Sequence, residues 1–367
     1  MPDVLIFADT IRSPELRHEV PVAAPDPMIY VERNGTRRVY AGSLEVPRLQ
    51  EVDGLEPVAA EALGIDELIA AGLGWHEIDV ELVLRACRHS EITEAVVPRS
   101  FPLGAADHLR VNSIEVHADG DLFDRRRRSK TEVEVAGIRR ALSASERAMD
   151  RVREVLGGGG QVTCEELRAE IAGVFSAAGM ITPDLVIVSH GEQTAVGHEP
   201  GHGAIEAGEP VVVDLYPQDP DSGCYSDMTR TFCLGDPPEE LVKIQGLCRE
   251  ALDRVYEALR PGVLGSELHR ISCEPFEREG YPTQLTKKPG EVLDEGFYHS
   301  LGHGVGLEVH ELPLLGRNGE EIVPGDVLAI EPGGYRKGFG GCRLEDLVFV
   351  TDDGFELLTD YPYDLGV

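Results

Sequence analysis

The stretch Gly302-His303-Gly304-Val305-Gly306-Leu307-Glu308-Val309-His310-Glu311 places two histidines seven residues apart among three glycines. Because glycine has no side chain, the backbone here can approach a metal ion or a substrate closely. Glycines are also common turn residues, so this stretch does not define a site by itself. The chemistry of His303 and His310 therefore depends on what the rest of the chain places beside them.

Four other segments carry an acidic residue at or near an apolar, strand-like run. They are Val211-Val212-Val213-Asp214, Asp227-Met228-Thr229-Arg230, Ala329-Ile330-Glu331 and Arg343-Leu344-Glu345. Asp214 and Asp227 are 13 residues apart, and Glu331 and Glu345 are 14 apart. Each spacing fits two adjacent antiparallel strands, so the sequence predicts two hairpins that each carry two carboxylates.

Acids flanked by such apolar runs are expected to be half-buried. An ionised carboxylate is costly to bury unless it is paired or binds a cation. Four carboxylates facing one another would hold a charge of about −4, which two divalent cations would neutralise. With one imidazole added, the ligands are mostly hard oxygen donors, and these favour Mn(II) or a similar ion over a thiolate-bound zinc.

Around these segments, the pattern predicts an α+β domain from about residue 130 to residue 367. Apolar residues at three- and four-residue steps predict a helix over 135–156, capped by Ser129 or Thr131 and ended by the glycines at 157–160. The capping-box pattern Thr163-x-x-Glu166 predicts a second helix that ends near Gly179. We expect strands at 185–188, 211–215, 228–234, 327–330 and 344–350, and helices at 238–259 and 265–279.

Residues 1–127 read as a separate α/β domain. A strand is expected at 4–7, a hairpin at 28–31 and 38–41 around Asn34-Gly35, and a helix at 78–87. The basic run 125–128 follows acidic residues, which favours a segment of local ion pairs over a nucleic-acid patch.

The composition narrows the class of protein. The 367 residues suffice for two domains, and the formal net charge of −32 disfavours nucleic acid and anionic membranes as partners. Seven cysteines form no Cys-x-x-Cys pair, which indicates free thiols in a reducing compartment. The first residues lack the pattern of a signal peptide, and no window approaches 18 consecutive apolar residues. We therefore expect a soluble cytoplasmic protein.

As a set, the five segments resemble those of the pita-bread metallopeptidase family, which includes Xaa-Pro aminopeptidases, Xaa-Pro dipeptidases (prolidases) and methionine aminopeptidases. The resemblance covers about residues 130–367, and residues 1–127 are similar in size and position to a creatinase-type domain. It implies an α+β chain with a pita-bread catalytic domain at 128–367, preceded by the smaller α/β domain at 1–127.

The resemblance also implies a ligand set for two divalent metal ions per chain. Asp214 would chelate the first metal, Asp227 and Glu345 would bridge both, and His303 and Glu331 would complete the second. Manganese is the expected metal, with cobalt or zinc as alternatives.

Catalytic and substrate-binding residues follow in the same way. His310 would steady the tetrahedral intermediate, and Glu331 would serve as general base. His198 is favoured over His202 for a further catalytic histidine. His299 would lie on the substrate side, and Arg343 would orient ligands beside the substrate.

The implied reaction is hydrolysis of the bond between an N-terminal residue and proline, with attack by a hydroxide held between the metals. The expected partners are dipeptides or short peptides with proline in the second position, and a homodimer is expected. The alternatives are a methionine aminopeptidase, a metal-independent creatinase, and a non-catalytic pita-bread module that binds proteins.

Two features depart from the family pattern or lie outside it. The family often has glycine two residues after the first aspartate, where this chain has Tyr216, and the loop 218–224 follows with the acids Asp219 and Asp221. We therefore expect Tyr216 to reshape the pocket. Histidines at 190 and 202 are expected in loops, and those at 108, 117 and 269 at the surface.

Overall fold

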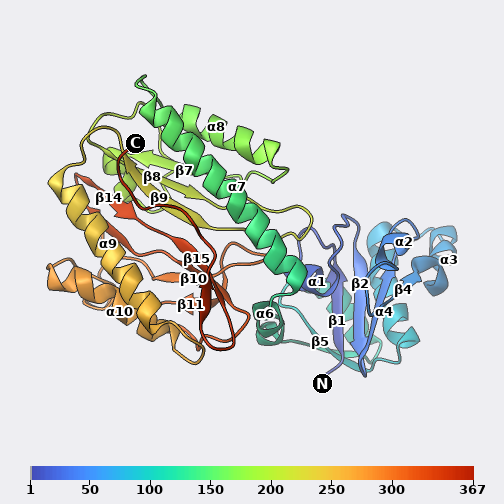
Figure 1. The fold of residues 1–367 in the computed structure, drawn as a ribbon. Coiled ribbons are helices and arrows are strands. Elements are labelled where there is room, and N and C mark those ends of the chain that lie inside the picture. Colours follow the sequence, from blue (N-terminus) through green and yellow to red (C-terminus); the bar gives the residue numbers. More distant parts are fainter. Residues whose placement is uncertain (1) are drawn as a thin grey trace. The chain divides into compact units, whose positions relative to one another are not determined.

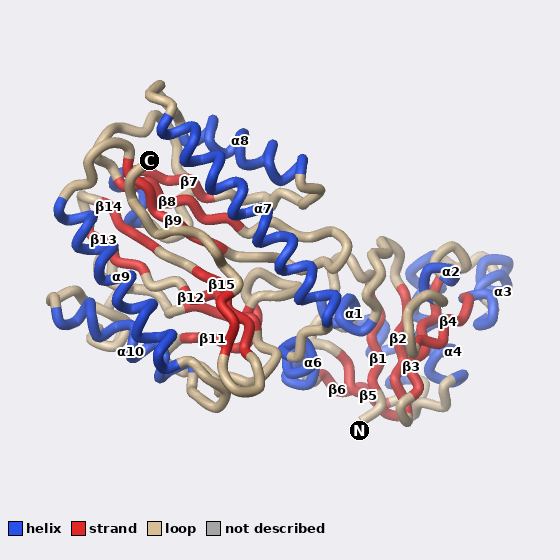
Figure 2. The backbone as a smooth tube through the Cα atoms, in the orientation of Figure 1, coloured by secondary structure: helices blue, strands red, loops and turns tan. Residues whose placement is uncertain are grey.

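A computed structural model describes residues 2–367 as two compact units. The first unit runs up to Arg127 and includes Asp221–Gly223, and the second comprises Arg128–Pro220 and Cys224–Val367. Figure 1 follows the chain through both units, and Figure 2 marks their helices and strands. Each unit has its own sheets and cores, so each is described by itself.

The first unit is built on a six-stranded sheet with the strand order β4-β3-β2-β1-β5-β6. Its strands are β1 (Val4–Ala8), β2 (Met28–Arg33), β3 (Thr36–Ala41), β4 (Leu55–Ala59), β5 (Glu94–Val97) and β6 (Glu115–Ala118). Its helices are α1 (Pro14–Glu19), α2 (Val46–Leu49), the 3-10 turn η1 (Ala60–Leu63), α3 (Ile65–Ala70), α4 (Trp75–His89), α5 (Leu103–Val111) and α6 (Gly120–Arg128). The last residue of α6 already belongs to the second unit.

Alternation along the strands gives this sheet a core on each face. In β1, Leu5 packs into one apolar cluster, while Val4 and Ile6 pack into the other. The expected hairpin is confirmed: β2 and β3 pair antiparallel around Asn34 and Gly35, which both have positive φ. A turn with two positive-φ residues matches the twist of the strands it joins.

The basic run at 125–128 forms ion pairs, as its acidic surroundings indicated. Arg126 pairs with Glu19 and Glu32, and Arg127 pairs with Asp124. Arg128 belongs to the second unit and pairs with Asp326 there.

The second unit contains three sheets and four long helices. Its sheets have the orders β7-β8-β9, β11-β10-β12-β15-β16 and β13-β14. The helices are α7 (Glu132–Gly157), α8 (Cys164–Ala177), α9 (Glu239–Ala258) and α10 (Gly265–Arg278), with the 3-10 turn η2 (Gly191–Ala195). The strands are β7 (Ile187–His190), β8 (Pro210–Leu215), β9 (Met228–Cys233), β10 (Gly302–Gly304), β11 (Glu311–Leu315), β12 (Val327–Ile330), β13 (Gly333–Arg336), β14 (Gly340–Arg343), β15 (Asp346–Val350) and β16 (Phe355–Leu357).

Two helix pairs enclose the strands of this unit between them (Figure 1). Val327 and Ala329 of β12 pack into the core with α7 and α8, whereas Leu328 and Ile330 pack into the core with α9 and α10. Successive side chains of a strand point to opposite faces, so a strand covered on both faces is apolar throughout. The mixed α+β architecture and the four helices agree with the prediction, and α7 begins at the cap Thr131.

Two predicted strands of the second unit begin two residues later than expected, at Ile187 and Asp346. The strand expected at 344–350 is interrupted, because the backbone N–H of Glu345 donates to Thr229 O of β9 (3.0 Å) instead of continuing a ladder. The strand expected at 185–188 is instead β7, because its ladder with β8 begins where Ile187 lies opposite Asp214.

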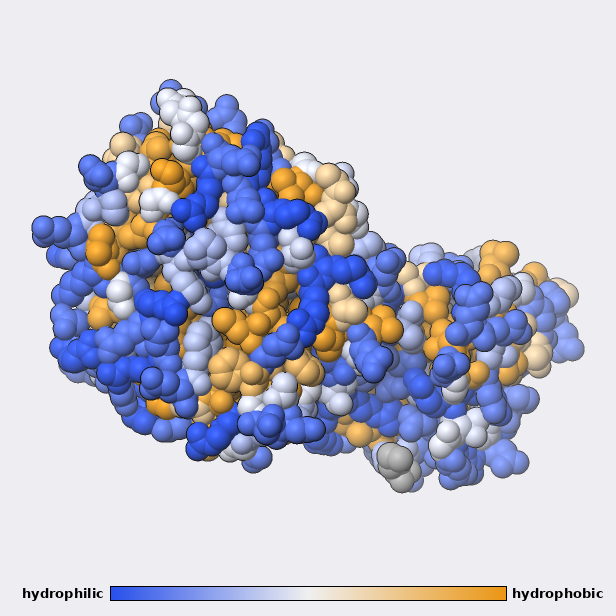
Figure 3. All heavy atoms as spheres, viewed as in Figure 1, coloured by the Kyte–Doolittle hydropathy of each residue, from blue (hydrophilic) through white to orange (hydrophobic). Residues whose placement is uncertain are grey.

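Within residues 2–367 we find no helix that combines the length and apolar character needed to cross a bilayer. Figure 3 shows hydrophilic residues over most of the face in view, with apolar residues in small groups.

Candidate metal centre

The five predicted ligands come from five places in the second unit and line one cavity of about 1070 Å3. Asp214 lies within β8, Asp227 precedes β9, and His303 is the central residue of β10. Glu331 follows β12, and Glu345 lies between β14 and β15. The fold thus gathers residues from across more than a hundred positions around one space.

Alternation explains how an acid in an apolar strand faces the cavity. Val211, Val213 and Leu215 of β8 pack into the core with α7 and α8. Asp214 has the opposite orientation along the strand, so its carboxylate lies on the other face of the sheet.

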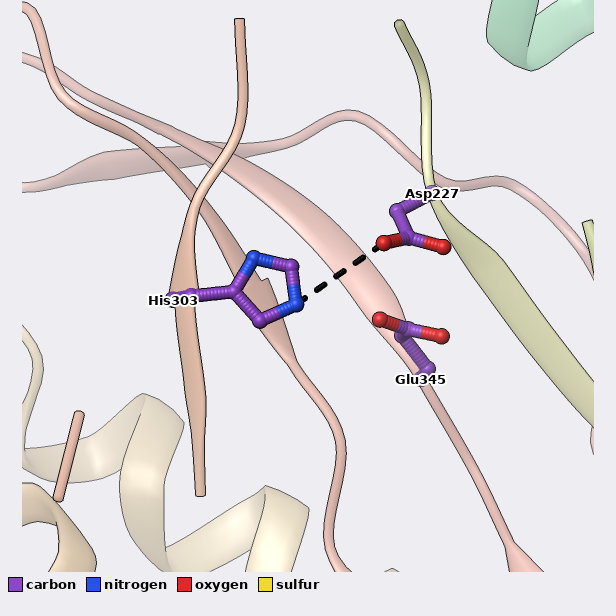
Figure 4. A group of neighbouring side chains, drawn as sticks. All are labelled: Asp227, His303 and Glu345. Atoms are coloured by element: carbon purple, nitrogen blue, oxygen red, sulfur yellow. Dashed lines mark ion pairs between the residues drawn. The ribbon is translucent and has the colours of Figure 1, made fainter. Parts of the chain in front are cut away.

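The closest group consists of Asp227, His303 and Glu345, whose ligand atoms all lie within 4.8 Å of one another. Figure 4 shows both carboxylates and the imidazole directed toward a common point. His303 Nε2 lies 3.8 Å from Asp227 Oδ2 and 3.7 Å from Glu331 Oε1. All three residues of the closest group are buried.

The environment of His303 keeps Nε2 available as an electron-pair donor. Nδ1 lies 3.1 Å from Gly304 O, so it is the nitrogen that carries the proton and donates. Burial, with a further contribution from His310, lowers the pKa of His303 to about 3. The ring is therefore neutral near pH 7, the form in which imidazole binds metals.

The clustered carboxylates repel one another, and the pKa values of three of them are raised. Burial, followed by Glu345 and Asp214, raises the pKa of Asp227 well above its ordinary value. Burial, followed by Asp214 and Glu331, raises the pKa of Glu345 in the same direction. The pKa of Glu331 rises to about 8, mainly through burial. A nearby cation would favour the ionised form of all of them.

Asp214 carries an unsatisfied oxygen. Its Oδ2 accepts a hydrogen bond from Arg343 Nη2 at 2.7 Å, but its buried Oδ1 has no hydrogen-bond partner. Buried polar atoms are normally satisfied by protein, water or an ion. This oxygen, the clustered carboxylates and one neutral imidazole together fit oxygen-preferring divalent cations.

Arg343 connects two of the acids. Besides Asp214 it contacts Thr229 Oγ1 through Nε (3.3 Å), and that hydroxyl donates to Glu345 Oε2 at 2.6 Å. Arg343 is 4% exposed. Arg343 thus contacts Asp214 directly and Glu345 through Thr229, and it lines the cavity.

His299 lines the cavity and contacts a tyrosine side chain. Its Nε2 is 2.9 Å from Tyr335 Oη, and its Nδ1 is 2.7 Å from Ser300 O. Burial, followed by the charge of Arg343, lowers the pKa of His299 to about 3. Arg343 Nη1 donates to the same Tyr335 oxygen (3.2 Å), so the tyrosine links the histidine to the arginine.

Two more histidines face the cavity. The His310 ring lies 4.1 Å from the His303 ring, centroid to centroid, and burial and then His198 lower the pKa of His310. His198 also lines the cavity. His202 is absent from the described cavity lining, and its backbone instead contacts Gln193. The structure therefore brings His198, rather than His202, to the metal-ligand candidates.

Tyr216 lines the cavity as expected from its position after Asp214. Burial, followed by Asp214 and Asp227, raises the pKa of Tyr216 to about 12, so the phenol stays protonated near pH 7. Asp219 of the following loop points elsewhere and forms two hydrogen bonds with Arg140, at 2.9 and 2.8 Å.

Sequence reasoning missed Thr229 and Tyr335, and it misplaced His269. Thr229 lies two residues after Asp227, near the start of β9, a spacing that could have identified it. Tyr335 gave no comparable signal, because its partners His299 and Arg343 are brought to it only by folding. His269 was expected at the surface, but it is fully buried within α10.

Solved structures share this fold over the whole chain. The Xaa-Pro dipeptidase from Bacillus anthracis has a TM-score of 0.80 at 23% identity, covering 100% of this chain and 95% of its own. The X-Pro aminopeptidase from Thermotoga maritima also has a TM-score of 0.80, at 22% identity, covering 99% and 97%. At these identities the likeness concerns the fold.

Sequence relatives carry the comparison further. A protein named "Probable dipeptidase PepE" from Mycobacterium tuberculosis is 34% identical over 340 residues, covering 89% of this chain and 83% of its own. The Xaa-Pro dipeptidase of Pyrococcus furiosus is 33% identical over 238 residues, covering 63% and 62%. The pattern of metallopeptidase family M24 matches residues 136–352, which include all five predicted ligands. The chain therefore belongs to metallopeptidase family M24.

Proposed function

We propose that the protein hydrolyses the bond between an N-terminal residue and proline, using two divalent metal ions held by Asp214, Asp227, His303, Glu331 and Glu345. The observation that carries this proposal is the convergence of Asp227, His303 and Glu345 within 4.8 Å in one cavity. The relatives named Xaa-Pro dipeptidase support the choice of substrate.

When bound, the cations would polarise the peptide carbonyl and lower the pKa of the attacking water. Asp227 and Glu345 belong with His303 to the closest ligand group and would help to hold both ions. Glu331 would accept the proton of the water and return it to the leaving proline nitrogen. Its carboxylate lines the same cavity and lies 3.7 Å from His303 Nε2, which supports that role.

The histidines that contribute no metal bond would bind the reacting peptide. His310 would donate to the oxygen of the tetrahedral intermediate, and His198, which also lines the cavity, would hold the far side of the scissile bond. His299, fixed by Tyr335, would contact the substrate beside Arg343. Tyr216 would narrow the space near the metals and so restrict the size of the residue bound there.

A matched assay tests the activity. Manganese-loaded protein is incubated with Gly-Pro, Gly-Pro-Ala, Met-Ala-Ser and Gly-Ala, and products are separated by chromatography. Cleavage of Gly-Pro alone identifies a dipeptidase, and release of glycine from Gly-Pro-Ala identifies an aminopeptidase. Release of methionine without cleavage before proline would instead establish the methionine aminopeptidase alternative. No cleavage with two metals bound would refute the substrate class.

The non-catalytic alternative is disfavoured by the complete ligand set, and it predicts a protein that binds no metal after loading. Manganese is the proposed ion, to be checked by elemental analysis of protein purified without added metal. We also propose a homodimer in the cytoplasm. Seven buried free cysteines suit a reducing compartment. A light-scattering mass near that of one chain, 40.0 kDa, would contradict the dimer.

A further inference from the structure

A buried ion pair lies directly behind His310. Glu311 is the next residue and the first of β11, and its carboxylate pairs with Lys130 Nζ. The side chains of Lys130 and Glu311 are only 3% and 2% exposed. The two residues are 181 positions apart, so the contact joins the start of the second unit to the segment that carries His310.

Hydrogen bonds of the neighbouring residues hold Lys130 in place at the start of the long helix α7. The following residue, Thr131, is the N-cap of this 26-residue helix, and it exchanges capping hydrogen bonds with Glu134 at 3.2 and 2.7 Å. Two residues earlier, Arg128 contacts both carboxylate oxygens of Asp326 at 2.8 and 2.7 Å. The ammonium of Lys130 is therefore presented by a rigid segment of the same unit.

The backbone before His310 is shaped around the pair. A Cβ atom at Gly306 would lie 2.7 Å from Glu311 Oε1 and 2.7 Å from Lys130 Cε, so only glycine fits here without displacing the two side chains. The loop is also tied elsewhere, because Gly306 O accepts from Tyr225 N at 2.8 Å. In the antiparallel pair of β10 and β11, Gly304 lies opposite Glu311. The loop and the ion pair thus fit one another closely.

Stability alone is a weak reason for such a pair. Removing two charges from water costs several kcal/mol for each, and apolar side chains of similar size often stabilise a fold as well or better. A buried pair does fix geometry, because each charge must keep its partner. His310 is adjacent in sequence to one of these charges, and its ring lies 4.1 Å from that of His303.

We propose that Lys130 is a positioning residue of the reaction: through Glu311 it holds the imidazole of His310 in its working orientation. The inference rests on the proposed function of His310. Lys130 itself touches neither substrate nor metal in this scheme. Its effect is on the placement of His310, where a shift of about 1 Å is enough to lower the rate on the order of 10²-fold.

The test replaces both charges together, since either single change would leave a buried charge without its partner. The variant Lys130→Met/Glu311→Met is compared with the unaltered protein for thermal unfolding, metal content, and kcat and KM on an Xaa-Pro substrate. We expect near-normal unfolding and metal content with kcat at least about tenfold lower. The control Arg128→Met/Asp326→Asn removes a neighbouring buried pair that does not adjoin His310. It is expected to change stability no more than the Lys130→Met/Glu311→Met variant does and to leave kcat within about twofold.

A second background separates positioning from a general structural effect. If Lys130 acts through His310, the Lys130→Met/Glu311→Met change costs almost nothing further in a His310→Ala protein, because the residue it places is gone. If the Lys130→Met/Glu311→Met change lowers kcat in the His310→Ala protein by the same factor as in the unaltered protein, the inference is wrong. Full activity of the Lys130→Met/Glu311→Met protein would also overturn it.

The proposed role of Lys130 can be tested even if the proposed substrate is wrong. If the unaltered protein cleaves none of the peptides, the proposed function fails, and the position of His310 is then read from its imidazole signals by NMR, assigned with His310→Ala. Those signals shift in Lys130→Met/Glu311→Met and stay in place in the Arg128→Met/Asp326→Asn control if Lys130 positions His310. Unchanged signals in both variants would refute it.

Discussion

The two units each hold a cluster of buried or half-buried carboxylates, and they balance the charge differently. In the first unit, Glu19 and Glu32 contact two guanidinium groups: Arg126 lies 2.8 and 2.6 Å from them, and Arg37 lies 3.2 Å from Glu19. Tyr30 donates to the same carboxylates. Two negative charges thus meet two positive ones within the protein.

In the cavity of the second unit, the four carboxylates of Asp214, Asp227, Glu331 and Glu345 lie near one guanidinium, Arg343, which is bonded to Asp214. The remaining negative charge has no counterpart among the described side chains that line the cavity close to these acids. A balanced cluster is complete as a structural element, whereas an unbalanced one must take up protons or a metal cation from solution. Both units bury acids, so charge imbalance, rather than burial of acids, distinguishes the candidate metal site from the structural cluster.

The largest expected effect comes from removing a proposed bridging ligand. Glu345→Gln should abolish binding of one metal and lower kcat/KM by about 10³-fold or more, which corresponds to about 4 kcal/mol. The measurement is metal content by elemental analysis together with Xaa-Pro hydrolysis. A protein that keeps two metals and full activity would show that Glu345 is not a ligand.

The excess of negative charge in the cavity should make the stability of the metal-free protein depend on pH. The pKa of Glu331 is raised from 4.5 to about 8 and those of Asp227 and Glu345 are also raised, so the folded chain binds more protons than the unfolded chain in this window. The free energy of unfolding should therefore fall as pH rises from about 4.5 to 8, by several kcal/mol. Denaturant titrations with a chelator test this, and saturating metal should remove the decline. A metal-free stability that stays flat over this range would contradict it.

In the balanced cluster the arginine should matter for stability and not for activity. Arg126→Met leaves Glu19 and Glu32 with less counter-charge in a partly buried place, and we expect a loss of about 2 kcal/mol in unfolding free energy. Metal ions should not restore this loss, and kcat should be unchanged. Rescue of stability by divalent metal would mean that the first unit also binds a cation.

A comparable effect, confined to acidic pH, is expected from an uncharged buried base. Burial, followed by Arg317, lowers the pKa of His269 to about 4. The unfolded chain binds this proton more readily, so stability is lost as pH falls through about 6.5 toward 4. His269→Leu should remove about 2 kcal/mol of the destabilisation between pH 7 and pH 5. An unchanged acid sensitivity would mean that other groups cause it.

Much of the second unit could be predicted because its signals are local. The three- and four-residue periodicity of α7, and the capping pairs at Thr131 and Thr163, lie within one helix each. The interruption at Glu345 could not be predicted in this way. It arises because its N–H bonds to Thr229 on a strand that is distant in sequence.

The sequence by itself determined which residues could hold metal: acids at the ends of apolar strands and a histidine among glycines, because a buried carboxylate must be paired or bind a cation. Only the tertiary structure decided which of these meet, that His198 and not His202 faces them, that His269 is buried, and that Lys130 reaches Glu311 across 181 positions. Contacts between distant segments depend on how the sheets and helices pack, and they leave no periodic trace in the chain.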